Sequence, residues 1–363
     1  MVDNPSLIIG GVDTHADTHT VAALNSLGQL LGHATFPANA AGYRALLRWL
    51  SGHGHVHQVG VEGTGSYGAG LARHLSSHGI TVVEVDRPNR QQRRRHGKSD
   101  PADAVAAARA VLAGTATATP KSRTGVAESL RVLRATQRSA EKARTAALNS
   151  LRHMVIAAPQ DLREPLDALK GKSLISACVA LRPDPAQLHD PRQATKISMR
   201  RLALRASALS AELAEVKADI KTLVTQVAPD LLAHLGVGPD TASQLLVTAG
   251  DNPDRLHNDA SFAALCGVSP VRASSGRTDR HRVNRGGDRH ANSALWRIVL
   301  VRMRHHQPTR DYVARRTAQG LNKREIMRCL KRFLARELLP DIHHALTPST
   351  HNHIPLQTGA SAA

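Results

Sequence analysis

The stretch Leu7-Ile8-Ile9-Gly10-Gly11-Val12-Asp13 decides how the beginning of this chain folds. It is a short run of β-branched and apolar residues bounded by polar turn residues, and at this length such a run favours a buried strand over a helix. The strand would end in a carboxylate, that of Asp13. One acid at a strand end proves little, so its meaning depends on which other acids the fold brings near it.

Outward from this stretch, the pattern predicts the order β-β-β-α-β-α-β followed by a last helix. Strands are expected at 7–13, 19–24, 29–36, 57–62 and 80–85, and helices at 40–51, 66–77 and 100–113. Short links make the first three strands antiparallel neighbours. The order is that of an α/β RNase H-like (RuvC-like) fold, in which the first strand is central. We expect this domain to occupy residues 1–118.

That fold would gather four carboxylates. Asp13 would lie on the central strand and Glu62 at the end of a neighbouring strand, while Asp100 and Asp103 lie on one face of the first turn of a helix. Grouped carboxylates repel one another unless cations neutralise them, and oxygen ligands suit Mg²⁺ or Mn²⁺. Two such ions can stabilise the attacking and leaving oxygens of a phosphodiester. Each acid taken alone is better explained as a helix cap or a solvated surface charge, and only the four together in this strand order favour the metal site.

Two other motifs in this domain have competing interpretations. Gly63-Thr64-Gly65-Ser66-Tyr67-Gly68 matches the dinucleotide fingerprint, with Glu84 at the expected distance, but it follows the fourth strand and lies directly behind an acid. Asp13, His15, Asp17 and His19 alternate as zinc ligands in a hairpin do. Histidines that face solvent in a hairpin are the interpretation we favour there.

Composition indicates a polyanionic partner. The 363 residues carry a net charge of +19 and the pI is about 11.0. Residues 1–85 hold five acids against three arginines, so the positive excess lies in the remainder. A solubilising basic surface is the alternative to a nucleic-acid partner. A basic run without acids precedes Asp100, and the residues expected to hold a phosphate backbone there are Arg90, Arg93, Arg94, Arg95 and Lys98.

The remaining composition limits the class of protein further. Cys178, Cys266 and Cys329 are far apart and odd in number, so neither a zinc site nor a disulfide framework is expected and the compartment is reducing. No signal peptide or membrane span is expected. Aromatic residues make up 2%, which argues against an RRM or OB platform for base stacking.

The middle of the chain, residues 119–228, is expected to be a helical coiled-coil region. Helices are predicted at 126–155 and 195–227. The second carries an a/d heptad seam, which fits either a hairpin within one chain or a contact between chains. Its seam residues are Leu202, Leu209, Val216 and Leu223, interleaved with Leu213, Ile220 and Val227.

Residues 229–345 are expected to form a mostly α-helical domain, and 346–363 a disordered tail. Leu235-Gly236-Val237-Gly238-Pro239 has the form of a helix-hairpin-helix turn, whose amides can bind phosphate. Helices are also predicted at 259–266, 290–305, 309–319 and 322–338. Ser275 lies beside a glycine in a strongly cationic setting, and serine attack on phosphorus needs such charge stabilisation. Residue types alone still favour a structural loop serine. The neighbouring cations are Arg277, Arg280, Arg282 and Arg285.

The chain resembles the IS-one-ten (IS110) family of insertion-sequence transposases, also called bridge-RNA-guided recombinases. The resemblance covers about residues 7–340 in the order of the family's motifs. The matching segments are Gly11-Val12-Asp13 with His15, Val61-Glu62-Gly63-Thr64-Gly65-Ser66-Tyr67, Lys98-Ser99-Asp100-Pro101-Ala102-Asp103-Ala104, Leu235-Gly236-Val237-Gly238-Pro239, Leu265-Cys266-Gly267-Val268-Ser269-Pro270 and Ser275-Gly276.

The resemblance implies a transposase that cuts and rejoins DNA. Asp13, Glu62, Asp100 and Asp103 would be its DEDD set for Mg²⁺, and Ser275 its covalent nucleophile, although Ser274 directly precedes it. It also implies a structured guide RNA that pairs with element ends and target DNA, and a dimer or tetramer whose composite site takes acids and serine from different subunits. We expect a cytoplasmic, nucleoid-associated bacterial protein. The alternative is a metal-dependent DNA junction nuclease that uses the four acids alone.

Overall fold

The chain divides into two compact units, residues 1–122 and 123–363, and each is described by itself. The computed structural model describes residues 7–86, 99–273, 281–282 and 284–347. The predicted division at residues 118, 228 and 345 stays a prediction, and nearly all of the predicted tail lies outside the described residues. No helix in the described ranges is long and apolar enough to cross a membrane.

The first unit is built on a mixed five-stranded sheet. Its strands are β1 (Leu7–Thr14), β2 (Thr18–Asn25), β3 (Leu30–Pro37), β4 (His55–Glu62) and β5 (Thr81–Val85). The strand order is β3-β2-β1-β4-β5, with β1 antiparallel to β2 and parallel to β4. The opening stretch of the sequence is therefore the central strand, as the pattern predicts.

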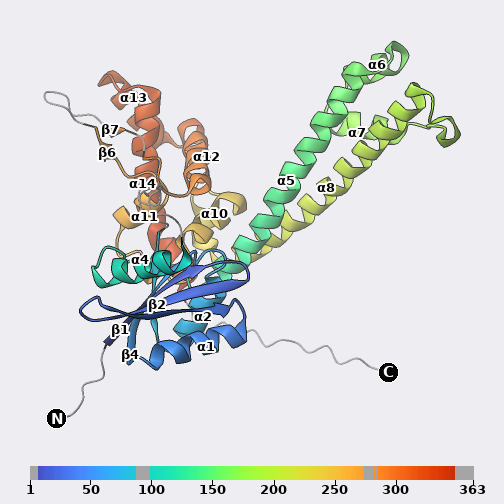
Figure 1. The fold of residues 1–363 in the computed structure, drawn as a ribbon. Coiled ribbons are helices and arrows are strands. Elements are labelled where there is room, and N and C mark those ends of the chain that lie inside the picture. The colour runs from blue at the N-terminus through green and yellow to red at the C-terminus, as the bar shows by residue number, and fades with distance from the viewer. Residues whose placement is uncertain (1–6, 87–98, 274–280, 283, 348–363) are drawn as a thin grey trace, which may run out of the picture. The chain divides into compact units, whose positions relative to one another are not determined.

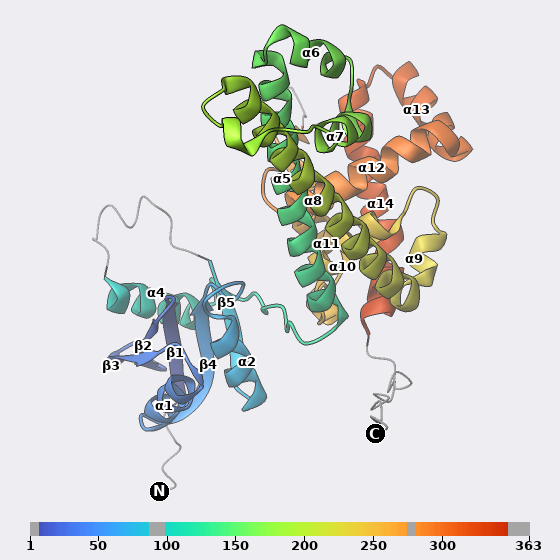
Figure 2. The same cartoon turned by 90° about the vertical axis from the view of Figure 1, so that its right-hand side faces the viewer.

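Helices cover the two faces of this sheet. α1 (Ala40–Ser51) and α2 (Ala69–Ser77) lie on one face and α4 (Asp100–Leu112) on the other (Figures 1 and 2). Side chains alternate along β1. Ile8 and Val12 pack in the core beneath α1 and α2, whereas Ile9 packs with Ala108 and Val111 of α4. Gly11 and Asp13, two and four residues after Ile9, therefore face α4.

Glycines on the sheet let α4 approach very closely. A Cβ atom on Gly11 would lie 2.2 Å from Ala104 O and from Ala108 N, both backbone atoms of α4. A Cβ on Gly60 of β4 would lie 2.7 Å from a Val111 methyl group. Real Cβ atoms do not approach backbone this closely, so any larger residue at Gly11 would lift the helix from the sheet.

The second unit begins with two long helices joined by shorter ones. α5 (Val126–Ala157) leads to α6 (Gln160–Asp167) and α7 (Gly171–Val179), and α8 (Pro191–Val227) returns beside α5 (Figure 1). One core cluster holds the end near α6 and α7, and includes Leu151, Leu174 and Met199. Another joins the opposite end of both helices to the C-terminal helices.

The predicted seam of the second long helix is partly right. Leu213, Val216 and Ile220 are buried, whereas Leu202, Leu209, Leu223 and Val227 are half-buried. Leu202, Leu223 and Val227 still pack against the core clusters. The stripe continues instead through Ala203, Ala206 and Val224. Alanines allow close packing within one chain. A coiled-coil contact between chains remains a prediction.

The C-terminal helices pack around one core with this long pair. They are α9 (Pro229–Ala233), α10 (Pro239–Ala249), α11 (Asp259–Leu265), α12 (Arg289–His305), α13 (Gln307–Ala318) and α14 (Lys323–Leu346), with short strands β6 (Val271–Arg272) and β7 (His281–Arg282). α9 and α10 flank Gly236, whose φ is +88°. The turn thus has the predicted glycine geometry, while phosphate binding by it stays a prediction.

A buried arginine fastens α5 to α10. Arg134 is 5% exposed and donates to Asp240 O, Asp240 Oδ1 and Ser243 Oγ at 2.9 Å each. Burial by itself would raise the pKa of Asp240, but hydrogen bonds from Arg134, Gln137 and Arg297 lower it to about 2. The carboxylate therefore stays ionised at neutral pH, and Arg134 has its counter-charge.

Replacing Gly11 by Ala is expected to loosen α4. The new methyl group would meet the helix backbone at 2.2 Å, and overpacking of this kind costs about 3 kcal/mol or more. Hydrogen exchange of the α4 amides in the full chain should then become about 100-fold faster, because opening becomes easier.

Gly32→Ala is the matched control. Gly32 lies on β3 of the same sheet, and a Cβ there would make an ordinary 3.5 Å contact with the Trp49 ring. This variant should leave α4 exchange unchanged. Equal exchange of α4 in the Gly11→Ala variant and the natural sequence would contradict the close packing.

Candidate active site

Strand register places two of the predicted acids side by side. β1 and β4 are parallel, with Val12 opposite Val61, so Asp13 and Glu62 follow as neighbours at the ends of the strands. Both face α4, because Gly11 and Gly60, two residues earlier, do. Asp13 is 5% exposed and Glu62 6%. Two carboxylates are thus largely removed from water at one edge of the sheet.

The other two acids come from the first turn of α4. Asp100 and Asp103 begin this helix, and both are half-buried. Carboxylates are favoured in a first helical turn by the free backbone N–H groups. Since α4 packs on Gly11 and Gly60, its N-terminal turn belongs to the sheet face that carries Asp13 and Glu62.

His15 joins this group, although the sequence did not single it out as a site residue. Its Nε2 lies 3.1 Å from Asp13 Oδ2 and 3.4 Å from Asp100 Oδ1. The ring therefore links the central strand to the first turn of α4. The sequence did carry one signal, which is that His15 lies two residues after Asp13. Our interpretation instead expected the His15 side chain to face solvent.

The chemistry of this donor set fits a divalent cation. Ligand atoms of Asp13, His15 and Asp100 all lie within 4.8 Å of one another, and Glu62 ends the adjacent strand. Oxygen ligands with one imidazole nitrogen suit Mn²⁺ and Mg²⁺, and the clustered negative charge favours any such ion. Asp13, Asp100 and His15 are the described residues that would hold it.

The competing zinc interpretation fails on geometry. His19 is buried on the opposite face, where its ring stacks on Tyr43 of α1 at 5.6 Å, and Asp17 is exposed. The expectation that the hairpin histidines face solvent is thus wrong for His19. Burial lowers the pKa of His19, which keeps its ring neutral.

The glycine-rich loop after β4 is held by hydrogen bonds within its own turn. Ser66 N and Gly68 N both donate to Gly63 O, and Gly63 has a φ of +65°. Thr64 Oγ1 donates to Glu84 Oε1 at 2.6 Å, so the acid that would bind a ribose is engaged within the protein. These contacts give the motif a structural explanation without a dinucleotide.

Most of the predicted nucleic-acid contacts lie outside the described residues. These are Arg90, Arg93, Arg94, Arg95, Lys98, Ser275, Arg277 and Arg280. Arg282 and Arg285 are described, and both are exposed. β6 and β7 pair antiparallel, with Val271 opposite Arg282, and flank in sequence the segment that carries Ser275.

Comparison with known families agrees with these observations. A transposase family model of the DEDD IS110 type matches residues 10–157, and a model described as "Transposase IS116/IS110/IS902 family" matches residues 229–314. The chain belongs to the IS110 family of transposases. It is therefore an enzyme of transposition that cuts and rejoins DNA, with a DEDD-type acidic site. No curated protein matches the chain.

Divalent cations should stabilise the first unit through this acidic site. A ligand that binds only the folded state raises its stability by mass action. We expect Mn²⁺ or Mg²⁺ at millimolar concentration to raise the melting temperature of the full chain by a few degrees. Asp13→Asn should remove most of that rise because it deletes one anionic ligand, and a fluorescence melting titration measures it.

Asp17→Asn controls for general charge effects. Asp17 lies four residues away on the same hairpin and is exposed. It should keep the full cation-dependent rise. The same loss in both variants, or a full rise with Asp13→Asn, would show that cations bind elsewhere.

Proposed function

We propose that this transposase breaks and rejoins DNA through a covalent phosphoserine link on Ser275, assisted by Mg²⁺ at Asp13, Glu62, Asp100 and Asp103. The observation that supports it most is the meeting of Asp13, His15 and Asp100 at the edge of the sheet. Two carboxylates and an imidazole nitrogen that converge in this way offer ligands to a divalent cation. The substrate is DNA because the chain belongs to a family of transposases.

The acids would act on charge and orientation. A cation bound there would neutralise the scissile phosphate and stabilise charge on the departing oxygen. Asp13 and Glu62, fixed on neighbouring strands, would hold it from the sheet side. Asp100 and Asp103 would hold it from α4. His15, whose Nε2 lies near both Asp13 and Asp100, would add a nitrogen ligand.

The serine step is an exchange of phosphate esters. The Ser275 oxygen bonds to phosphorus and its proton passes to a base, while the bond from phosphorus to a deoxyribose oxygen breaks and that oxygen is protonated. A DNA hydroxyl then attacks the phosphoserine and releases Ser275. The number of phosphodiester bonds is conserved, so rejoining needs no nucleotide cofactor.

The partners belong to the same proposal. Arg90, Arg93, Arg94, Arg95 and Lys98, and the group Arg277, Arg280, Arg282 and Arg285, would bind nucleic-acid phosphates. A structured guide RNA would select element ends and target by base pairing. The acids and Ser275 would act together in a dimer or tetramer, in the cytoplasm and associated with the nucleoid.

The alternative reaction uses the acids alone. A metal-dependent junction nuclease would activate water in place of Ser275, and its products would be hydrolysed ends. The convergence of Asp13, His15 and Asp100 supports this reaction as well, because a bound cation could activate water there. The two reactions differ in one product, a protein covalently joined to DNA.

Ser275→Ala should abolish covalent attachment. Full-length protein, any co-purified RNA, Mg²⁺ and labelled element-end DNA are incubated and separated on a denaturing gel. The natural sequence should give a labelled protein–DNA band, and Ser275→Ala should lower it by at least about 1,000-fold, as expected when a covalent nucleophile is removed.

Ser274→Ala is the matched control, since this serine is the direct neighbour of Ser275. It should keep the covalent band. Cleavage without a band, equal in all three proteins, would establish the nuclease instead. A band lost in Ser274→Ala and kept in Ser275→Ala would move the nucleophile by one residue.

A further inference from the structure

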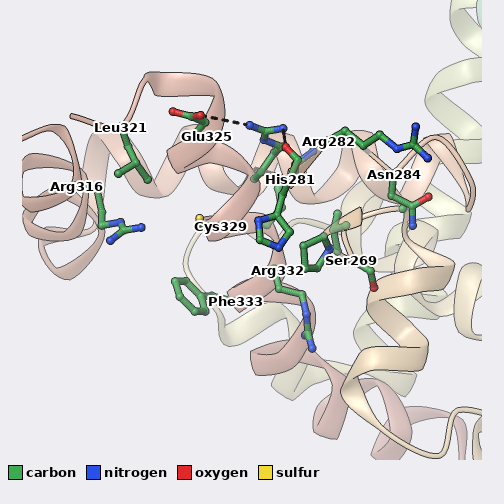
Figure 3. Close-up of a pocket in the computed structure, with 15 residues that line it drawn as sticks. Ser269, His281, Arg282, Asn284, Arg316, Leu321, Glu325, Cys329, Arg332 and Phe333 are labelled. Atoms are coloured by element: carbon green, nitrogen blue, oxygen red, sulfur yellow. Dashed lines mark hydrogen bonds and ion pairs between the residues drawn. The ribbon is translucent and has the colours of Figure 1, made fainter. Parts of the chain in front are cut away.

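A pocket of about 550 Å³ opens in the second unit. Figure 3 shows its lining side chains coming from the turn before β6, from β7, from the end of α13 and from α14. β6 and β7 are the strands that flank the Ser275 segment in sequence. Pockets of about 300–1,000 Å³ are the size that encloses small molecules or single nucleotides.

The lining is strongly cationic. Five of its residues are basic and one is acidic among the described part of the wall. Arg328 lies 3.9 Å from that acid, Glu325. Arg332 is paired with Asp259, which lies outside the lining, at 2.9 Å. The five cations still outnumber these two carboxylates, which favours an anionic ligand. The basic residues are Arg282, Arg316, Arg328, Lys331 and Arg332.

Lys331 is the most informative of these cations. Its Nζ donates to a neutral acceptor, Asn292 Oδ1, at 2.7 Å. Burial and the nearby Arg328 lower the pKa of Lys331. A half-buried ammonium group beside a like charge gains from an anionic ligand. A phosphate oxygen would supply that charge.

Arg316 is a second cation of the lining, after Lys331, that would gain from an anionic ligand. Its Nε is buried and has no hydrogen-bond acceptor among the described residues, although its Nη1 donates to Gln319. The guanidinium lies 6.0 Å from the Tyr312 ring centre, so it is held in place at the rim of the pocket.

Apolar side chains also line the pocket, and one of them is an exposed aromatic ring. Val268, Pro270 and Leu321 line it, together with Phe333 of α14. Phe333 is 42% exposed. Its ring is fixed by an edge contact with Tyr312 at 5.6 Å and by Arg336 at 5.7 Å. Aromatics are rare in this chain, and a rigid exposed ring beside cations is a platform for a base.

We propose that this pocket takes one unstacked nucleotide of a DNA strand, with its base on Phe333 and its flanking phosphates on Arg316, Arg328 and Lys331. The proposal rests on the proposed function in one respect, which is that the strand on which this transposase acts is DNA. Removing a base from its stack is easiest at unpaired positions. The pocket should therefore prefer single-stranded DNA to duplex.

Photocrosslinking tests where the base lies. A single-stranded DNA oligonucleotide carrying 5-iododeoxyuridine is bound to the full-length protein and irradiated, and the attached peptide is identified by mass spectrometry. The crosslink should map to Phe333. Phe333→Leu, which keeps an apolar side chain at the position, should lower its yield by about tenfold or more.

Trp296→Leu is the matched control, because Trp296 is another exposed aromatic of this unit, at 45%, and does not line the pocket. It should keep the Phe333 crosslink. A crosslink that maps elsewhere, or one that survives Phe333→Leu, would overturn the proposal. Stronger crosslinking of an RNA oligonucleotide of the same sequence would overturn the assignment to DNA.

A binding titration tests the phosphate contacts. Lys331→Gln should weaken binding of the single-stranded DNA by about tenfold and reduce the slope of log K against log salt by about one. An unchanged affinity and slope in a variant with a normal melting temperature would overturn the phosphate assignment.

Ser275→Ala separates this proposal from the proposed function. The crosslink to Phe333 should be the same in Ser275→Ala as in the natural sequence, since it needs no reaction. A natural protein that crosslinks at Phe333 but forms no covalent band would refute the serine chemistry alone. A covalent band without that crosslink would refute the pocket alone.

Discussion

The close contact between α4 and the sheet is the constraint on which the first unit depends. Gly11 and Gly60 leave room for the helix backbone itself, so the first turn of α4 is fixed against the strand ends that carry Asp13 and Glu62. The acids of two distant segments are therefore placed by backbone packing, before any ligand binds.

Carboxylates that lie close together raise the free energy of the folded state unless a positive charge neutralises them. In the second unit the chain itself supplies the counter-charge, because Arg134 binds Asp240 directly and keeps this carboxylate ionised. In the first unit, His15 is the described side chain that contacts Asp13 and Asp100, and it is charged only when protonated. This difference favours a structural role for the Arg134–Asp240 pair and supports the proposal that the group of Asp13, His15 and Asp100 binds a cation.

Much of the first unit could be predicted from sequence, because strand runs, short links and acids at strand ends are local patterns. The central position of the first strand followed from them. The roles of His15 and His19 did not, since they depend on which sheet face each ring meets: His15 reaches Asp100 and His19 packs on Tyr43. The heptad interpretation of α8 missed the part that small residues play, because Ala203 and Ala206 are fully buried while Leu202 and Leu209 are half-buried. The serine assignment rests on family resemblance.

The most direct test of the account is to locate the cation itself. Crystals of the full-length protein soaked with Mn²⁺ would be measured at a wavelength where manganese scatters anomalously. The account predicts an anomalous peak within about 2.3 Å of carboxylate oxygens from both Asp13 of β1 and Asp100 of α4. A fully soaked crystal with no peak between these two elements, or with its peak on other residues, would contradict the claim that packing of α4 on the sheet assembles a metal site.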